Sequence, residues 1–179
     1  KLSSNLSYNL RGSYIAQNDK ALFKYNPRYD DGAGSTGNEG YQFGNSFNVV
    51  FDDVETFSFF GELNYDLSNL KLRINAEAFT YDTTYEEEAW NLPDFKASFY
   101  ADYQIDEHWF TGAQLFYVGE RKDEFNITGP AITENPYTVT LGSYFDANLH
   151  LGYRFNDQLS IFARGNNLLN NNYQRWMNF

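Results

Sequence analysis

The sequence contains no cysteine, and it has only 4 prolines and 1 methionine among its 179 residues. Without cysteine the chain has no disulfide scaffold, no thiolate metal cluster and no cysteine nucleophile. Basic residues are also scarce, because 13 Lys and Arg stand against 24 Asp and Glu, giving a formal net charge of −11. A nucleic-acid backbone is bound through a basic surface. We therefore expect no nucleic-acid partner.

Long apolar runs are absent too, and none approaches the roughly 18 consecutive apolar residues of a membrane-spanning helix. The first residues lack the basic start, apolar stretch and cleavage site of a signal peptide, so we expect a mature chain or a fragment. Aromatic residues, by contrast, make up 20% of a chain whose mean hydropathy is −0.61. A sheet with one face against lipid and the other against water needs both features.

Alternation of apolar and polar residues is the strongest pattern in the chain. It is clearest over Leu2–Ala16 and Val139–Phe155, and a period of two indicates a strand with one apolar and one polar face. Noisier segments repeat it, and no convincing helix is found. The predicted fold class is all-β, with about seven long strands at 2–16, 44–67, 70–82, 94–105, 109–121, 139–155 and 158–168.

The connections between these strands alternate in length. Tight turns are expected at 66–69, 106–108 and 156–158, and longer polar segments at about 18–42, 83–92 and 122–137. Short turns at one end and long loops at the other are typical of antiparallel up-and-down barrels of the outer membrane.

The phase of the alternation predicts which side chains face lipid: Leu6, Tyr8, Leu10, Phe145, Leu149, Leu151, Tyr153 and Phe155. Ten residues of a strand tilted by about 40° span about 25 Å of membrane, which is the height expected of a lipid-facing band. Aromatic rings would then mark both interfaces, with Tyr65, Tyr103, Trp109 and Tyr153 in one row and Tyr14, Phe57 and Tyr117 in the other. A soluble antiparallel sandwich also alternates, but strands this long are unusual there and an uncovered apolar row would aggregate.

The C-terminal third resembles the end of a TonB-dependent outer-membrane receptor β-barrel. Phe145 leads to Leu151-Gly152-Tyr153-Arg154-Phe155, and Asn167-Leu168-Leu169-Asn170-Asn171-Asn172-Tyr173 is similar to the Asn-Leu-Phe-Asn/Asp-x-x-Tyr segment of that family. Weaker similarity extends upstream through 90–95 and 117–121, so that it covers roughly residues 40–179. The resemblance implies a barrel of about 22 strands, placed in the outer membrane of a Gram-negative cell.

Two departures from the family shape the expected domain. The family has a further strand after this point, whereas the chain ends at Trp176-Met177-Asn178-Phe179, and no plug with its coupling box precedes Lys1. We therefore expect residues 1–179 to be the C-terminal portion of a larger barrel, with plug and final strand absent. The implied partners are outer-membrane lipid, the rest of the barrel, the plug, and the TonB energy-coupling complex acting through the plug. Further partners that the resemblance implies are a surface lipoprotein or other outer-membrane subunits.

Polar residues of the opposite phase are candidates for contact with a substrate or plug in the lumen: Arg73, Asp102, Asp146, Asn148, His150, Arg154 and Arg164. Pairing across strands and hydration explain such residues equally well. His150 lies near mid-strand, and the other histidine, His108, lies in a tight turn. A hydrolase would need a histidine beside a carboxylate or hydroxyl near a mouth. We expect no enzyme activity, catalytic residue or cofactor.

The long loops hold acidic and aromatic residues. Glu86-Glu87-Glu88 with Asp82, and Asp30-Asp31, lack the spacing of a calcium site, so we expect a solvated acidic rim and no metal site. Such a rim would steer cations inward. Loop rings that would stack on a ligand or fold their own loop are Phe23, Tyr25, Tyr29, Tyr41, Tyr85 and Trp90. Residues 32–37 match G-x-G-x-x-G, but no helix follows them to bind a pyrophosphate.

Three functional hypotheses follow. The first is a receptor that imports a scarce nutrient, such as an iron chelate, cobalamin, a sugar or a peptide, by energy coupling. The second is a plugless barrel that is a structural subunit of an outer-membrane assembly. The third is a small 8-stranded barrel, whose interior would be filled with side chains.

Overall fold

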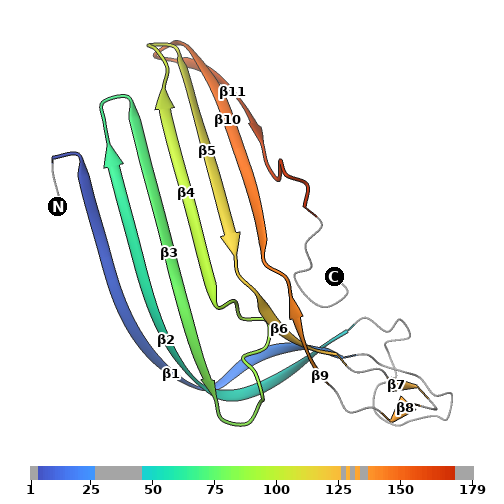
Figure 1. The fold of residues 1–179 in the computed structure, drawn as a ribbon. Helices are drawn as coiled ribbons and strands as arrows, with labels where there is room; N and C mark the ends of the chain where they lie inside the picture. Colours follow the sequence, from blue (N-terminus) through green and yellow to red (C-terminus); the bar gives the residue numbers. More distant parts are fainter. Residues whose placement is uncertain (1–3, 27–45, 126–127, 130–131, 134–136, 172–179) are drawn as a thin grey trace.

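A computed structural model describes residues 4–26, 46–125, 128–129, 132–133 and 137–171. Its main element is an antiparallel sheet of seven strands in the order β1-β2-β3-β4-β5-β10-β11 (Figure 1). The bounds are β1 Leu6–Asn26, β2 Ser46–Asp66, β3 Leu70–Thr83, β4 Phe95–Gln104, β5 Trp109–Val118, β10 Tyr144–Asn156 and β11 Leu159–Gly165. Two small sheets pair β6 (Arg121–Phe125) with β9 (Tyr137–Leu141) and β7 (Thr128–Gly129) with β8 (Ile132–Thr133). The described residues include no helix that is long and apolar enough to cross a membrane.

The chain runs up and down through neighbouring strands. The three predicted tight turns join β2 to β3, β4 to β5 and β10 to β11 at one end of the sheet, and the long connections lie at the other end (Figure 1). We call these the turn end and the loop end. Side chains close the turns, since the Asp106 carboxylate accepts the N–H groups of His108 and Trp109 at 2.8 and 2.7 Å.

The strand register gives the sheet one apolar and one polar face. One continuous row across six strands contains apolar side chains: Tyr8, Leu63, Ile74, Phe99, Leu115 and Ala147. A neighbouring row on the opposite face is mostly polar: Lys71, Asp102, Gly112, His150 and Arg164. The predicted alternation is thus confirmed as a property of the whole sheet, because facing strands keep the same phase.

The apolar face is uncovered in this chain. Leu10, Phe57 and Leu149 on it are 61%, 55% and 49% exposed. Among the described elements, the seven strands contact their sheet neighbours, and the further contact of the large sheet is that of β1 with β6. No second sheet in the described part of the chain packs against this face, as a sandwich would require.

The first strand is longer than its periodicity predicts. It was expected to end at Ala16, but it continues to Asn26 through a register shift between Gln17 and Lys20, where Asp19 has a φ of 52°. A bulge of this kind inserts one extra residue, so the alternation of apolar and polar residues changes phase there. A prediction from alternation alone therefore ends the strand at the bulge. The predicted loop from residue 18 therefore begins too early, and residues 27–42 lie outside the described part.

The predicted strand over 139–155 is two strands with different partners. Tyr137–Leu141 pairs with β6, and the chain changes partner at Gly142-Ser143 before Tyr144 begins the strand that pairs with β5. The alternation continues through the break, so it cannot reveal the change. The last strand likewise ends at Gly165 rather than 168.

Candidate functional site

The polar face is hollowed where four strands of the sheet lie side by side. A pocket of about 190 Å³ is lined by Tyr100, Asp102, Ala113, Gln114, Asn148, Leu149, His150 and Arg164. Tyr100, Gln114 and Asn148 form one cross-strand row, and the next row passes from Asp102 through Gly112 to His150 and Arg164. Because Gly112 has no side chain, its neighbours in the row lean toward each other over its backbone. We call this hollow the wall pocket.

The charged groups of the wall pocket are of both signs. The Nε2 atom of His150 lies 4.0 Å from Oδ1 of Asp102, whose side chain is 68% exposed. Arg164 is the direct cross-strand partner of His150 on the other side. The pocket therefore presents a carboxylate on β4 and a guanidinium on β11, with an imidazole between them.

The structure brings four of the seven predicted lumen residues together in the wall pocket: Asp102, Asn148, His150 and Arg164. Arg73 faces Tyr100 across the sheet but is not among the residues that line the pocket. Its Nε donates to Asn64 at 2.8 Å and lies 3.9 Å from Glu62. Arg154 lies nearer the turn end, with its guanidinium 6.0 Å from the centroid of the Phe110 ring.

Asp146 is held by the segment that follows the last strand. Asp146 is 3% exposed, and its carboxylate accepts the N–H of Ala147 at 2.7 Å. The side-chain amide nitrogen of Asn167 faces Asp146 and donates to both of its carboxylate oxygens at 3.1 Å. The backbone N–H of Asn167 also donates to Asn148. These bonds give Asp146 a structural contact that the sequence did not reveal.

The residues predicted to face lipid are all in phase with the apolar face of the sheet. Leu6, Tyr8 and Leu10 pair with Tyr65, Leu63 and Gly61. On β10, Phe145, Leu149, Leu151 and Tyr153 pair with Tyr117, Ala113, Thr111 and Trp109, and the Phe155 ring packs edge-on against Tyr153 at 4.8 Å. Trp109 and Tyr153 also meet at 4.8 Å, so aromatic rings gather at the turn end as predicted.

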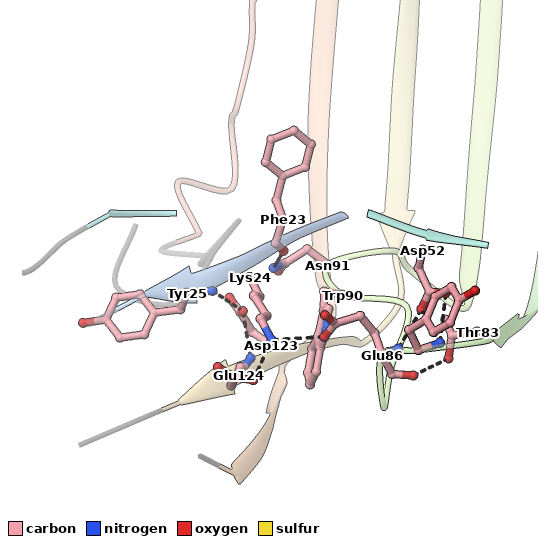
Figure 2. A network of polar contacts seen from close by, with 11 residues as sticks. Phe23, Lys24, Tyr25, Asp52, Thr83, Glu86, Trp90, Asn91, Asp123 and Glu124 are labelled. Atoms are coloured by element: carbon pink, nitrogen blue, oxygen red, sulfur yellow. Dashed lines mark hydrogen bonds and ion pairs between the residues drawn. The ribbon is translucent and has the colours of Figure 1, made fainter. Parts of the chain in front are cut away.

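A second cluster at the loop end was not foreseen, and Figure 2 shows it from close by. Asp52 is 1% exposed, and its carboxylate accepts the backbone N–H groups of three consecutive residues, Thr84, Tyr85 and Glu86, at 2.7 to 3.2 Å. Burial raises the pKa of this carboxyl, but the backbone donors outweigh it and hold the pKa below its ordinary value. A buried carboxylate thus fixes the backbone after β3.

Lys24 joins three segments in the same cluster. Its ammonium donates to Glu86 and to Glu124, both at 3.0 Å, and lies 5.6 Å from the centroid of the Trp90 ring (Figure 2). The indole N–H of Trp90 donates to Glu86 at 2.7 Å. Burial lowers the pKa of Lys24, but hydrogen bonds to the two carboxylates raise it more, so that the net pKa is raised.

Backbone contacts complete the tie between these segments. The carboxylate of Asp123, which is fully buried, accepts the N–H groups of Tyr25 and Glu124 at 2.8 and 2.9 Å. The side chain of Asn91 donates to the carbonyl of Phe23, and its backbone N–H donates to that of Lys122. We call Lys24, Asp52, Glu86, Trp90, Asp123 and Glu124 the loop-end cluster.

The cluster changes the interpretation of the loop residues. Glu86 was expected in a solvated acidic rim, yet it is paired and largely buried. Tyr25 and Trp90 are buried and fold the loop end onto itself, whereas Tyr85 is 76% exposed. The described residues contain no group of three or more His, Asp or Glu arranged to hold a metal ion. Tyr29, Tyr41, Asp30, Asp31 and residues 32–37 lie outside the described part.

Comparisons with known proteins bear on the fold. No family model and no curated protein matches the sequence. Among solved structures, the chain is similar to a ferripyoverdine receptor of the outer membrane of Pseudomonas aeruginosa, with a TM-score of 0.66, 14% identity, and coverage of 97% of this chain and 22% of that one. For the copper transporter OprC the TM-score is 0.62 and the identity 17%, with coverage of 97% of this chain and 24% of that one. For the siderophore receptor PirA from Acinetobacter baumannii the TM-score is 0.58 and the identity 15%, with coverage of 93% of this chain and 26% of that one.

The chain has the fold of part of an outer-membrane receptor β-barrel. The resemblance seen in its C-terminal residues is confirmed at this level. The chain spans about a quarter of the length of the receptors it matches, 22% to 26% in these three. Its seven-stranded sheet follows the wall of a much larger barrel, which disfavours the small 8-stranded alternative.

Proposed function

We propose that this chain is part of the wall of an outer-membrane transporter that imports a scarce nutrient by TonB-dependent energy coupling. The supporting observation is the division of the sheet into two faces that run without interruption across its strands. On this proposal the apolar face contacts lipid through Leu6, Tyr8, Leu10, Phe145, Leu149, Leu151, Tyr153 and Phe155. The polar face lines the lumen with Arg73, Asp102, Asp146, Asn148, His150, Arg154 and Arg164.

Residues 1–179 are, on this proposal, the C-terminal portion of the barrel domain. A plug inside the barrel would connect the lumen to the TonB complex, while this chain supplies wall and loops. The named neighbours are a transporter and receptors, which favours transport over catalysis. The wall pocket offers both signs of charge to a plug segment or a passing substrate.

The substrate is proposed at the level of a class, namely a scarce nutrient that diffuses poorly across the outer membrane. Two of the named neighbours are a ferripyoverdine receptor and a siderophore receptor, and one is a copper transporter. Iron chelates and copper therefore head the panel to be tested, followed by cobalamin, sugars and peptides.

The test is uptake in cells that lack the parent gene. Radiolabelled members of the panel are offered to the parent strain, to the deletion strain, and to the deletion strain supplied with the full-length protein. We expect uptake of one class to be lost on deletion, restored by the full-length protein, and abolished by collapsing the inner-membrane proton gradient. Unchanged uptake of every class would contradict transport and favour the structural-subunit hypothesis.

A further inference from the structure

Several charged side chains on the polar face have their partners within the chain. Arg11 lies 3.7 Å from Glu77. Arg73 lies 3.9 Å from Glu62 and donates to Asn64 at 2.8 Å. Each of these two guanidinium groups is thus paired with an acidic side chain of the same sheet.

Arg164 on β11 has no such partner. Within the part of the chain that the structure describes, its guanidinium makes no ion pair, hydrogen bond or aromatic contact. It lines the wall pocket together with two more donor groups that have no acceptor among the described residues, the hydroxyl of Tyr100 and the side-chain amide nitrogen of Gln114. Donors that surround a hollow without acceptors of their own are available to a ligand that supplies one.

The charge around the wall pocket is opposite in sign to that of the whole chain. On β3, β4, β5, β10 and β11, the two rows that cross the pocket hold three cationic residues, Lys71, Arg73 and Arg164, and one carboxylate, Asp102. In the whole chain, by contrast, 24 acidic residues stand against 13 basic ones. A local excess of positive charge attracts anions. Lys71 and Arg73 do not line the pocket itself, which leaves Arg164 as its fixed positive charge.

An acceptor lies at the other end of the same row. The side chain of Asp102 is 68% exposed, and its carboxylate lies 4.0 Å from Nε2 of His150, which is too far for a hydrogen bond. Three strand spacings separate Asp102 from Arg164, or about 14 Å between their Cα atoms. Both line the pocket of about 190 Å³, which has room for about six water molecules. The hollow therefore suits a molecule, or the end of one, with a few non-hydrogen atoms.

We infer that the wall pocket is a binding site for a compact carboxylate that also carries a hydroxyl or amino group, either as a whole solute or as the end of a larger one. The planar guanidinium of Arg164 matches a carboxylate with two parallel hydrogen bonds. Asp102 accepts the hydroxyl or amino group, and its charge disfavours a ligand with a second negative charge there. The inference rests on the proposed function, because a solute reaches the pocket only if the polar face lines a water-filled lumen.

The experiment measures the reactivity of Arg164 itself. Full-length protein in detergent is treated with hydroxyphenylglyoxal, which modifies accessible arginine side chains, and peptide mass spectrometry gives the modification rate of each arginine. Arg11 on the same face is the internal control, since it lies beside Glu77 and outside the pocket. The added probes are lactate, propionate, which lacks the hydroxyl, and lactamide, which lacks the charge, all at equal ionic strength.

We expect lactate to slow the modification of Arg164 and not that of Arg11. Two or three charge-assisted hydrogen bonds give a dissociation constant on the order of 1 mM, so about 10 mM lactate should slow Arg164 at least about threefold. Propionate should protect less, because it has no group that donates to Asp102, and lactamide should not protect. Asp102→Ala should remove the preference for lactate over propionate.

Two glycine variants test whether the protection comes from the wall pocket. A Cβ atom on Gly112 would occupy space that His150 and Asp102 fill, whereas one on Gly12 has no atom within 4 Å. Gly112→Ala should therefore largely abolish the protection by lactate, and Gly12→Ala should leave it unchanged. Full protection in Gly112→Ala would overturn the assignment of the site to this pocket.

The remaining outcomes separate this inference from the proposed function. If Arg11 reacts and Arg164 stays unreactive without any probe, another part of the protein already holds its guanidinium, and the site is overturned while the lumen stands. An Arg164 that reacts but is not slowed by lactate, or is slowed equally by lactamide, would also overturn the site. If neither arginine reacts until the protein is unfolded, the polar face does not line a water-filled lumen, and the proposed function is contradicted.

Discussion

The imidazole of His150 lies in the space that a side chain at position 112 would need. A Cβ atom built on Gly112 would contact the ring of His150 and would lie 2.6 Å from Oδ1 of Asp102. The absence of a side chain on β5 therefore allows an acid on β4 and a histidine on β10 to approach each other. The same relationship recurs toward the turn end, where the Phe110 ring covers Gly152. At both positions a glycine leaves room on the polar face for the ring of a residue on the neighbouring strand.

Substituting Gly112 should disrupt the wall pocket. Gly112→Ala forces the ends of the His150 and Asp102 side chains apart. Because both side chains are partly exposed and can turn away, we expect a cost at the low end of overpacking, about 1 kcal/mol of unfolding free energy. Gly12→Ala is the control, because a Cβ at Gly12 has no atom within 4 Å. Thermal unfolding of the full-length protein in detergent, followed by circular dichroism, compares the two. A Gly112 variant as stable as the Gly12 variant would show that the close approach is not needed.

Removing the ammonium of Lys24 should loosen the loop end. Lys24→Met leaves Glu86 and Glu124 facing each other with side-chain exposures of 19% and 20%. We expect a local loss of about 2–3 kcal/mol, somewhat below the cost for fully buried pairs. Hydrogen exchange at the amides of Tyr25 and Glu86 measures it. Adding Glu86→Gln and Glu124→Gln to Lys24→Met should restore part of the protection, because the two facing charges are removed. An unchanged exchange rate in Lys24→Met alone would show that Lys24 does not hold these segments together.

Acid should release the segment held by Asp52. The folded-state pKa lies below the ordinary 3.8, so the charged form is favoured by folding. Its stabilisation is complete above the unfolded pKa and is lost as pH falls through the folded one. The amides of Thr84, Tyr85 and Glu86 should therefore lose exchange protection below about pH 4. Asp52→Asn should have low protection at all pH values, and a pH response that survives in it would assign the effect to another group.

A charge on the apolar face should be far more harmful than one on the polar face. Ile74 is 50% exposed in the middle of the apolar row, and Asn75 is its neighbour on the opposite face. Ile74→Arg should cost about 2–4 kcal/mol if the row lies near the bilayer midplane. Asn75→Arg should cost far less. Urea titration of the full-length protein in lipid vesicles gives both values, and equal costs would argue against a bilayer on the apolar side.

Local features of the sequence predicted the sheet well. Alternation depends on neighbouring residues, so the faces of Leu10 and His150 and the turns near Asp106 could be predicted from the chain alone. The bulge near Asp19 and the change of partner after Leu141 were missed, because neither alters the residue types in a way that period-two counting detects. The expected size of the barrel came from the similarity of residues 167–173 to a known family, because alternation cannot give it.

The candidate sites were only partly predictable. Phase placed Asp102, His150 and Arg164 on one face, but their convergence depends on register and on Gly112 between them. The ion pairs of Lys24 join residues 62 and 100 positions away, and no local pattern indicates such partners. The run Glu86-Glu87-Glu88 was therefore expected to be solvated. Glu86 is instead held by Asp52, Lys24 and Trp90, which are distant or unpredictable partners in the sequence.

The most direct test of the account places spin labels on consecutive residues of β10. Single cysteines at Leu149, His150 and Leu151 of the full-length protein in lipid vesicles would be labelled, and collisions with oxygen and with a water-soluble nickel chelate would be measured. Oxygen concentrates in the acyl chains, so we expect it to dominate at Leu149 and Leu151, and the nickel chelate to dominate at His150. Nickel access at Leu149 and Leu151 that equals or exceeds that at His150 would contradict a lipid-facing apolar face.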